Sequence, residues 1–197
     1  MPDIGQRVIR DDDKLKAAPT VWAAGDCTSR LQFTHVGDEQ GRLAAKNAFA
    51  RGPFGGKAWD DRVIPWVTFT EPEVAHVGLT KAQAVEQHGD KVRVSTVLDR
   101  SGDRARTDGE LDGFVKLIAV PGPAGGMVLG KLVGMTVVGP MAGEQIAQGA
   151  LTMRIGALVG RLGQTVHAYP TWSLSTRVAA ARFFGAHGGS PAREGRK

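Results

Sequence analysis

The residues best suited to chemistry lie in the stretch TVHAYPTWSLSTRVAAARFF, which ends at Phe184. It places His167 two residues before Tyr169, and Pro170 follows directly. A histidine exchanges its proton near neutral pH, whereas a tyrosine with a pKa of about 10 keeps its proton and acts through hydrogen bonds. Both are candidate catalytic residues. Two structural alternatives stay open, because His167 could stabilise the turn and Tyr169 could pack with Trp172 where two chains meet.

A second group of candidates follows the apolar letters TVWAAGD, which predict a buried strand that ends at Gly25 and Asp26. Gly25 lacks a Cβ and allows a ligand to approach the backbone, while Asp26 can accept hydrogen bonds from sugar-like hydroxyls. The letters THVGDEQGRLAAKNAFA predict a helix with Thr34 as its N-cap, followed by His35. The N–H groups at a helix start attract electron-rich ligand atoms. The pattern fits a cofactor edge or an ordinary strand–turn–helix.

The elements that would position these groups fall into two parts, separated by the segment 51–59, which is rich in Gly and Pro and predicts a linker. From Val63 onward the letters IPWVTFT, KVRVSTVL, GFVKLIAV and GKLVGMTVVG predict strands, the last two joined as a hairpin. The letters TKAQAVEQHG predict a helix capped by Thr80 and stopped by Gly89.

The letters AGEQIAQGALTMRIGA predict a longer helix, and the apolar stripe expected on it is Ile146, Ala147, Ala150, Leu151 and Ile155. A shorter helix is expected from LVGRLGQT before the His167 turn. The fold class predicted from these elements is α+β, with an antiparallel sheet that carries helices on one side.

The composition is that of a globular chain: 197 residues, 42% hydrophobic, 23% charged, with a net charge of +5. The basic residues are dispersed among acidic ones, so we expect no nucleic-acid partner. No apolar run has the length of a membrane span or a signal peptide, which predicts a cytoplasmic protein without a membrane partner. Cys27 is the one cysteine, and no two of the five histidines stand at a metal-ligand spacing, so we expect no metal site.

Several motifs in one order resemble the FAD-dependent pyridine nucleotide-disulfide oxidoreductases. The letters VWAAGD followed by FTHVGDEQGR resemble the second flavin-binding segment of that family. The letters TFTEPEVAHVGLT, LVGMTVVGPMAGEQI and HAYPTWS resemble its C-terminal interface domain. The resemblance runs from about Arg10 to Gly185 and is nearest to dihydrolipoyl dehydrogenases and mercuric reductases.

This resemblance implies a C-terminal fragment of an FAD-binding α/β domain over residues 1–52, a dimerisation domain over 60–186 and a flexible tail over 187–197. It implies a homodimer, FAD as the cofactor of the complete enzyme, NAD(P)H as its reductant, and a role in cell redox homeostasis. Gly25 and Asp26 would contact the ribityl and pyrophosphate part of FAD. Backbone N–H groups around Thr34 and His35 would face the pyrimidine edge of the flavin.

The resemblance also gives the His167 turn a role, because in this family the turn crosses the two-fold axis to the partner's flavin. In disulfide-reducing members it reads His-x-His-Pro-Thr-x-x-Glu, where the second His is the acid/base and the Glu orients it. Tyr169 stands at that His and Leu174 at that Glu. Ordinary dithiol–disulfide turnover is therefore in doubt. Mercuric reductases carry the Tyr, but they retain the Glu and usually end in a cysteine pair, so mercury specificity stays open.

Three functions remain open at this level. The chain is expected to be a dimerisation domain that supplies a cross-subunit turn and is inactive alone, since it lacks a Gly-x-Gly-x-x-Gly turn and a Cys-x4-Cys pair. Alternatively, it acts as an oxidoreductase with the missing domains supplied in trans. The third alternative is a non-catalytic α+β binding domain.

Overall fold

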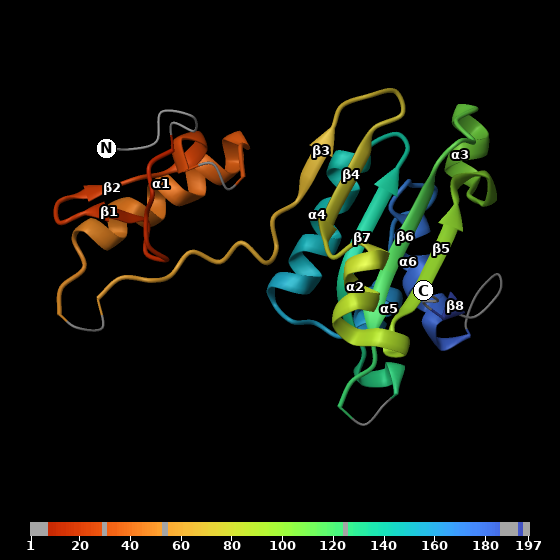
Figure 1. Ribbon diagram of the computed structural model, residues 1–197. Helices are drawn as coiled ribbons and strands as arrows, with labels where there is room; N and C mark the ends of the chain where they lie inside the picture. The colour runs from red at the N-terminus through yellow and green to blue at the C-terminus, as the bar shows by residue number, and fades with distance from the viewer. Residues whose placement is uncertain (1–7, 29–30, 53–54, 124–125, 186–192, 195–197) are drawn as a thin grey trace. The chain divides into compact units, whose positions relative to one another are not determined.

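The computed structural model describes residues 8–28, 31–52, 55–123, 126–185 and 193–194, and the chain divides into two compact units, Met1–Arg62 and Val63–Lys197 (Figure 1). The first unit contains β1 (Lys16–Ala18), β2 (Val21–Trp22), the 3-10 helix η1 (Gly25–Thr28) and α1 (Thr34–Ala48). The second unit contains β3 (Trp66–Thr68), β4 (Val74–Gly78), α2 (Lys81–His88), η2 (Gly89–Lys91), β5 (Arg93–Leu98), η3 (Asp99–Ser101), α3 (Asp103–Asp108), β6 (Phe114–Val120), η4 (Met127–Leu129), β7 (Lys131–Val138), α4 (Ala142–Arg154), α5 (Val159–Gln164), α6 (Leu174–Ala181), η5 (Arg182–Phe184) and β8 (Arg193–Glu194).

The strand predicted from TVWAAGD is much shorter than expected. It is the two-residue β2, paired antiparallel with β1, and Val21 is 49% exposed rather than buried. The chain leaves the strand after Trp22 and enters η1, because Gly25 adopts a φ of 76°, a left-handed conformation that glycine accepts readily. Gly25 therefore ends the hairpin and begins the turn that leads to α1.

Helix α1 confirms the predicted helix, but its N-terminus differs by one residue. Phe33 is the N-cap, in extended conformation and without a side-chain cap hydrogen bond, and Thr34 is the first helical residue. The expectation that Thr34 caps this helix is wrong. The helix is held by its buried face, and that face consists of Val36, Gln40, Ala44 and Asn47.

The segment 51–59, expected to be a linker, is partly tied to the first unit. Residues 53–54 lie outside the described part of the chain. Beyond them, the Asn47 amide donates to the carbonyls of Lys14 and Lys57 at 2.9 Å, and it accepts from the Lys57 N–H at 2.8 Å. The Trp59 N–H donates to the Asp13 carbonyl at 2.7 Å. A single buried amide thus fastens two chain segments to α1.

The second unit is built on a six-stranded antiparallel sheet in the order β3-β4-β7-β6-β5-β8. Helices α4, α5 and α6 lie along one face, as Figure 1 shows, and their apolar residues meet the sheet in the main core. On β6, Val115, Leu117 and Ala119 face that core, while Ile118 alternates to the other face and packs with α2. The predicted α+β class is confirmed, and α2 adds a small second core.

Most predicted elements of this unit are present. The strands and the β6–β7 hairpin are confirmed. Thr80 is the N-cap of α2, as expected, and forms a full capping box with Gln83. Gly89 ends α2 with a φ of 58°. Helix α3 was not expected, because its letters DRARTD are charged throughout and show no apolar stripe.

Helix α4 presents a different face to the sheet from the one predicted. Ile146 is buried as expected, but Leu151 and Ile155 are 62% and 68% exposed. The buried face is Ala142, Gln145, Ile146, Gly149 and Thr152. The helix is rotated so that a glycine faces the sheet at the closest contact. A Cβ added at Gly149 would lie 2.6 Å from the sulfur of Met135. The helix therefore approaches β7 closely and turns its larger apolar side chains outward.

A second glycine of the sheet, Gly134, marks a close backbone approach that can be tested by substitution. Gly134 pairs with Gly78 in β4 and with Ile118 in β6, and a Cβ there would collide with the carbonyl of Leu79. We predict that Gly134→Ala lowers the free energy of unfolding by about 1–3 kcal/mol, measured by chemical denaturation. Gly126→Ala is the control, because a Cβ there meets nothing within 4 Å. Equal stability of the two variants would contradict the packing described.

Candidate functional site

The turn between α5 and α6 carries both candidate catalytic residues. Both nitrogens of the His167 ring have a partner: Nδ1 lies 2.9 Å from the carbonyl oxygen of Thr165, and Nε2 lies 2.9 Å from the side-chain oxygen Oε1 of Gln148 on α4. Both partner atoms are acceptors, so a ring nitrogen contributes a hydrogen bond here only where it carries a proton. His167 therefore ties the turn to α4, in agreement with the structural alternative for this residue.

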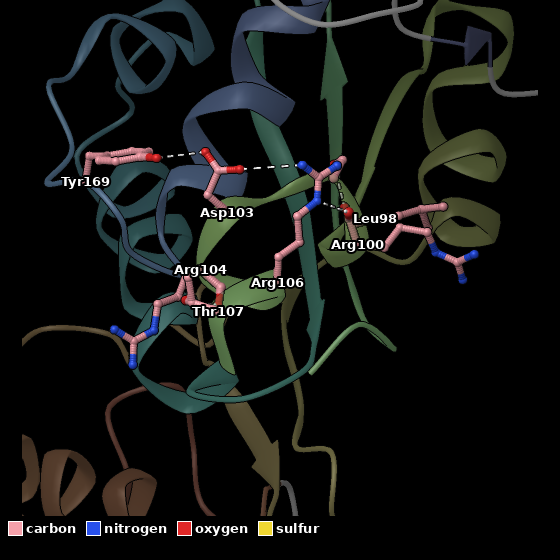
Figure 2. A network of polar contacts seen from close by, with 8 residues as sticks. Leu98, Arg100, Asp103, Arg104, Arg106, Thr107 and Tyr169 are labelled. Carbon is pink, nitrogen blue, oxygen red and sulfur yellow. Dashed lines mark hydrogen bonds and ion pairs between the residues drawn. The ribbon is translucent and has the colours of Figure 1, made fainter. Parts of the chain in front are cut away.

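Tyr169 lies further along the same turn, and its side chain is 69% exposed. Its hydroxyl donates to Oδ2 of Asp103 at 2.9 Å, and Oδ1 of Asp103 lies 3.6 Å from the Arg106 guanidinium (Figure 2). The peptide bond from Tyr169 to Pro170 is cis. The hydrogen bond to Asp103, together with its negative charge, raises the pKa of Tyr169 above its ordinary value. Tyr169 therefore keeps its proton at neutral pH.

No pattern in the sequence indicates Asp103 as a site residue. It is the first residue of α3, within a charged hexapeptide of the kind usually found on a solvated surface. It meets Tyr169 across 66 positions in the sequence, so no local spacing could have paired them. A pattern of side chains that face each other only through the fold is not visible in one sequence.

Beside this hydrogen bond lies a pocket of about 210 Å³. Its walls come from the end of β5, η3, α3, the turn and α6, and they comprise Val97, Asp99, Ser101, Gly102, Asp103, Arg104, Ala105, Tyr169, Pro170, Thr171, Trp172, Leu174, Ser175, Val178 and Arg182. Leu174, which stands at the Glu position of the resembling family, contributes an apolar wall to this pocket and no hydrogen-bond acceptor.

Asp99 is a buried acid in the wall of the same pocket. It is 3% exposed, and a Cβ at either Gly113 or Gly139 would collide with or crowd its carboxyl group. The two glycines therefore make room for the carboxyl group. Burial raises the pKa of Asp99 to about 6. This carboxyl changes its charge close to neutral pH, whereas the Tyr169 hydroxyl does not.

The candidate cofactor residues of the first unit gather at the start of α1. A Cβ at Gly25 would lie 3.3 Å from the Cα of Gly37, so η1 and the first turn of α1 touch through two glycines. The Gly25 N–H donates to the side chain of Gln40 at 2.7 Å, which fixes the turn on the helix. Asp26 follows on the turn and is exposed.

Thr34 and His35 are exposed in the first turn of α1. The His35 ring stacks on Phe33, with centroids 5.3 Å apart and planes inclined by 10°. The N–H groups of Val36 and Gly37 both donate to the Phe33 carbonyl at 3.0 Å. All four residues expected at a cofactor therefore lie at one end of α1, and His35 uses its ring locally.

Within the described ranges, no three His, Cys, Asp or Glu side chains come together as metal ligands. Over the same residues, no helix combines the length and apolar character needed to cross a bilayer.

Comparison with protein families gives a match over residues 64–180 to the model described as pyridine nucleotide-disulphide oxidoreductase, dimerisation domain. The mitochondrial dihydrolipoyl dehydrogenase of Schizosaccharomyces pombe is 34% identical over 177 residues, which are 90% of this chain and 32% of that protein. A mercuric reductase of Acidithiobacillus ferrooxidans is 34% identical over 176 residues, covering 89% of this chain and 30% of the relative. The chain spans about a third of the length of these curated relatives.

Solved structures give the same fold. LpdA of Mycobacterium tuberculosis superposes with a TM-score of 0.78 at 29% identity, covering 89% of this chain and 36% of that one. The HOCl-induced flavoprotein disulfide reductase RclA of Escherichia coli gives a TM-score of 0.78 at 24% identity, over 90% of this chain and 39% of its own. The latter likeness concerns the fold alone.

The buried Asp99 makes stability depend on pH. Because its folded pKa of about 6 lies above the ordinary aspartate value of 3.8, its charged form is disfavoured in the fold, and stability falls as pH rises from about 4 through 6. We predict that Asp99→Asn raises the free energy of unfolding near pH 7.5 by about 1–3 kcal/mol and flattens its decline between pH 4.5 and 7.5. Chemical denaturation at several pH values measures both effects.

The exposed Asp112, in the turn before β6, provides the matched control. Asp112→Asn removes the same charge from the surface, and we expect its stability to follow the parent chain within about 0.5 kcal/mol. If Asp99→Asn and the parent chain decline in parallel with pH, the buried carboxyl is not the source of the pH dependence.

Proposed function

The chain belongs to the pyridine nucleotide-disulphide oxidoreductase family through its dimerisation domain, and we propose that it forms a homodimer in which each subunit presents the Tyr169 turn to the flavin site of its partner. The enzymes of this family depend on FAD and NAD(P)H. The proposed role of the second unit is thus twofold: it joins two subunits, and it completes a redox site.

The observation that carries this proposal is the hydrogen bond of His167 to Gln148, which fastens the turn to α4. Ala147 and Leu151 on α4 and Ile155 at its C-cap recur every four residues and are exposed. Such a stripe on one helix face is typical of a surface that another protein covers, and the cores of homodimer interfaces are rich in apolar area. The turn is anchored to the helix that carries the apolar stripe, so a partner that covers the stripe comes close to the turn.

The chemistry proposed for the turn is binding rather than proton transfer. Tyr169 holds its proton, the His167 ring is engaged at both nitrogens, and Leu174 cannot accept a hydrogen bond. None of these groups forms the histidine–carboxylate pair that exchanges protons with a dithiol. The proposed reaction class is electron transfer from NAD(P)H to an acceptor that needs no proton from this turn. Cys27 is the one cysteine, so a redox dithiol has to come from outside these 197 residues.

The first unit offers residues that fit one part of FAD. The glycine contact between Gly25 and Gly37 brings a backbone turn against the start of a helix without intervening side chains. We propose that Gly25 and Asp26 would hold the ribityl and pyrophosphate part, and that N–H groups around Thr34 and His35 would face the flavin ring. Bound there, FAD would supply two-electron redox chemistry.

The dimer is tested by its mass. A chain of 20.9 kDa is predicted to elute in size-exclusion chromatography with light scattering at about twice that mass at micromolar concentration. Replacing both Leu151 and Ile155 by Glu places charges on the exposed face of α4, and we expect this double variant to be monomeric.

Leu129→Glu is the matched control, since Leu129 is 46% exposed but lies in η4, outside α4. It is expected to remain dimeric. A parent chain that is strictly monomeric, or a double variant that dimerises as well as the control, would refute the proposed interface.

A further inference from the structure

The Tyr169 hydroxyl donates to a carboxylate from a distant part of the chain, whereas Leu174, five residues further along, offers no acceptor. We propose that Asp103 is the positioning residue of Tyr169. Its carboxylate accepts the hydrogen bond of the Tyr169 hydroxyl, so the turn presents the lone pairs of the phenol oxygen to a substrate. This inference deepens the proposed function and rests on it for the statement that a substrate meets the turn.

The geometry fixes the direction of the hydrogen bond. A tyrosine hydroxyl has one proton, and at 2.9 Å from Oδ2 of Asp103 that proton is committed to the carboxylate. The carboxylate is itself held, because its Oδ1 lies 3.6 Å from the guanidinium of Arg106. Arg106 Nε in turn donates to the carbonyl of Arg100 at 3.3 Å (Figure 2). The chain of contacts leads from the exposed turn into the backbone of η3.

The remaining charges around Tyr169 do not offer a competing partner. The pocket beside it is also lined by Asp99, Arg104 and Arg182. Arg104 is directed to Asp108, with Nε 2.6 Å from Oδ2, and Arg182 donates to the carbonyl of Thr96. Asp99 is buried against glycines. The raised pKa of Tyr169 agrees with a hydroxyl that donates to a carboxylate.

The consequence concerns the class of substrate group. With its proton held by Asp103, the Tyr169 oxygen accepts a hydrogen bond and does not donate one. It therefore favours a group that carries a hydrogen, such as a thiol, an alcohol or an ammonium, over a thiolate or another anion. Tyr169 then orients the electron acceptor, and Asp103 determines that the Tyr169 oxygen accepts the hydrogen bond in that contact.

Tyr169 is the one tyrosine in the chain, so tyrosinate absorbance reports on it alone. The experiment compares the fraction of tyrosinate at about pH 10, where an ordinary tyrosine is half ionised. We expect a clearly smaller fraction in the parent chain than in Asp103→Asn, where loss of the carboxylate returns the tyrosine to about one half. Asp103→Glu keeps a carboxylate and should restore much of the low fraction.

Asp108→Asn is the control, because it removes a paired carboxylate from the same helix without touching Tyr169. It should match the parent chain. Circular dichroism at the same pH shows whether each variant keeps its fold. A parent chain that is half ionised at pH 10, or an Asp103→Asn variant that matches the parent, would overturn the proposal.

If Asp103→Asn fails to fold, a further variant tests whether Asp103 is the partner of Tyr169. Arg106→Gln removes the cation that shares the carboxylate, so the hydroxyl meets a more negative partner and the midpoint of its titration rises. A lowered or unchanged midpoint would count against Asp103 as the partner. These titrations need neither flavin nor dimer. A chain that is monomeric, but whose tyrosine ionisation depends on Asp103, would therefore reject the proposed function and retain the pairing of Asp103 with Tyr169.

Discussion

The close approach of α4 to the sheet at Gly149 is the contact on which the arrangement of the site depends. Because a small residue faces Met135, the helix settles against β7 and rotates Leu151 and Ile155 to the outside. The same rotation brings Gln148 to the ring of His167. One packing constraint thus creates an exposed apolar stripe and anchors the candidate turn beside it.

The turn is held at two points that lie far apart in the sequence. His167 fastens it to α4, and Tyr169 fastens it to Asp103 at the start of α3. Both anchors use the groups that acid/base chemistry would need to keep free. The turn is therefore better suited to orient a bound group than to move protons, which agrees with the absence of a histidine–carboxylate pair from its sequence.

Local patterns in the sequence predicted much of the fold, because strand alternation, the Thr80 cap and the Gly89 stop act over a few residues. They failed where tertiary packing decides. The predicted stripe on α4 includes Leu151 and Ile155, but close packing leaves both exposed and buries Ile146 together with smaller and polar residues. Phe33 caps α1 in place of Thr34, since the buried face holds that helix. Tyr169 was identified as a candidate, while Asp103 was missed because only the fold brings it near.

The most direct measurement of the central claim is a fluorine NMR spectrum of the chain labelled with 3-fluorotyrosine, which places one probe at Tyr169. If the turn is tied to Asp103 and faces a second subunit, the resonance shifts in Asp103→Asn, and it also shifts when charges at Leu151 and Ile155 prevent dimerisation. A resonance that stays in place in both variants would contradict the account, because Tyr169 would then have neither partner.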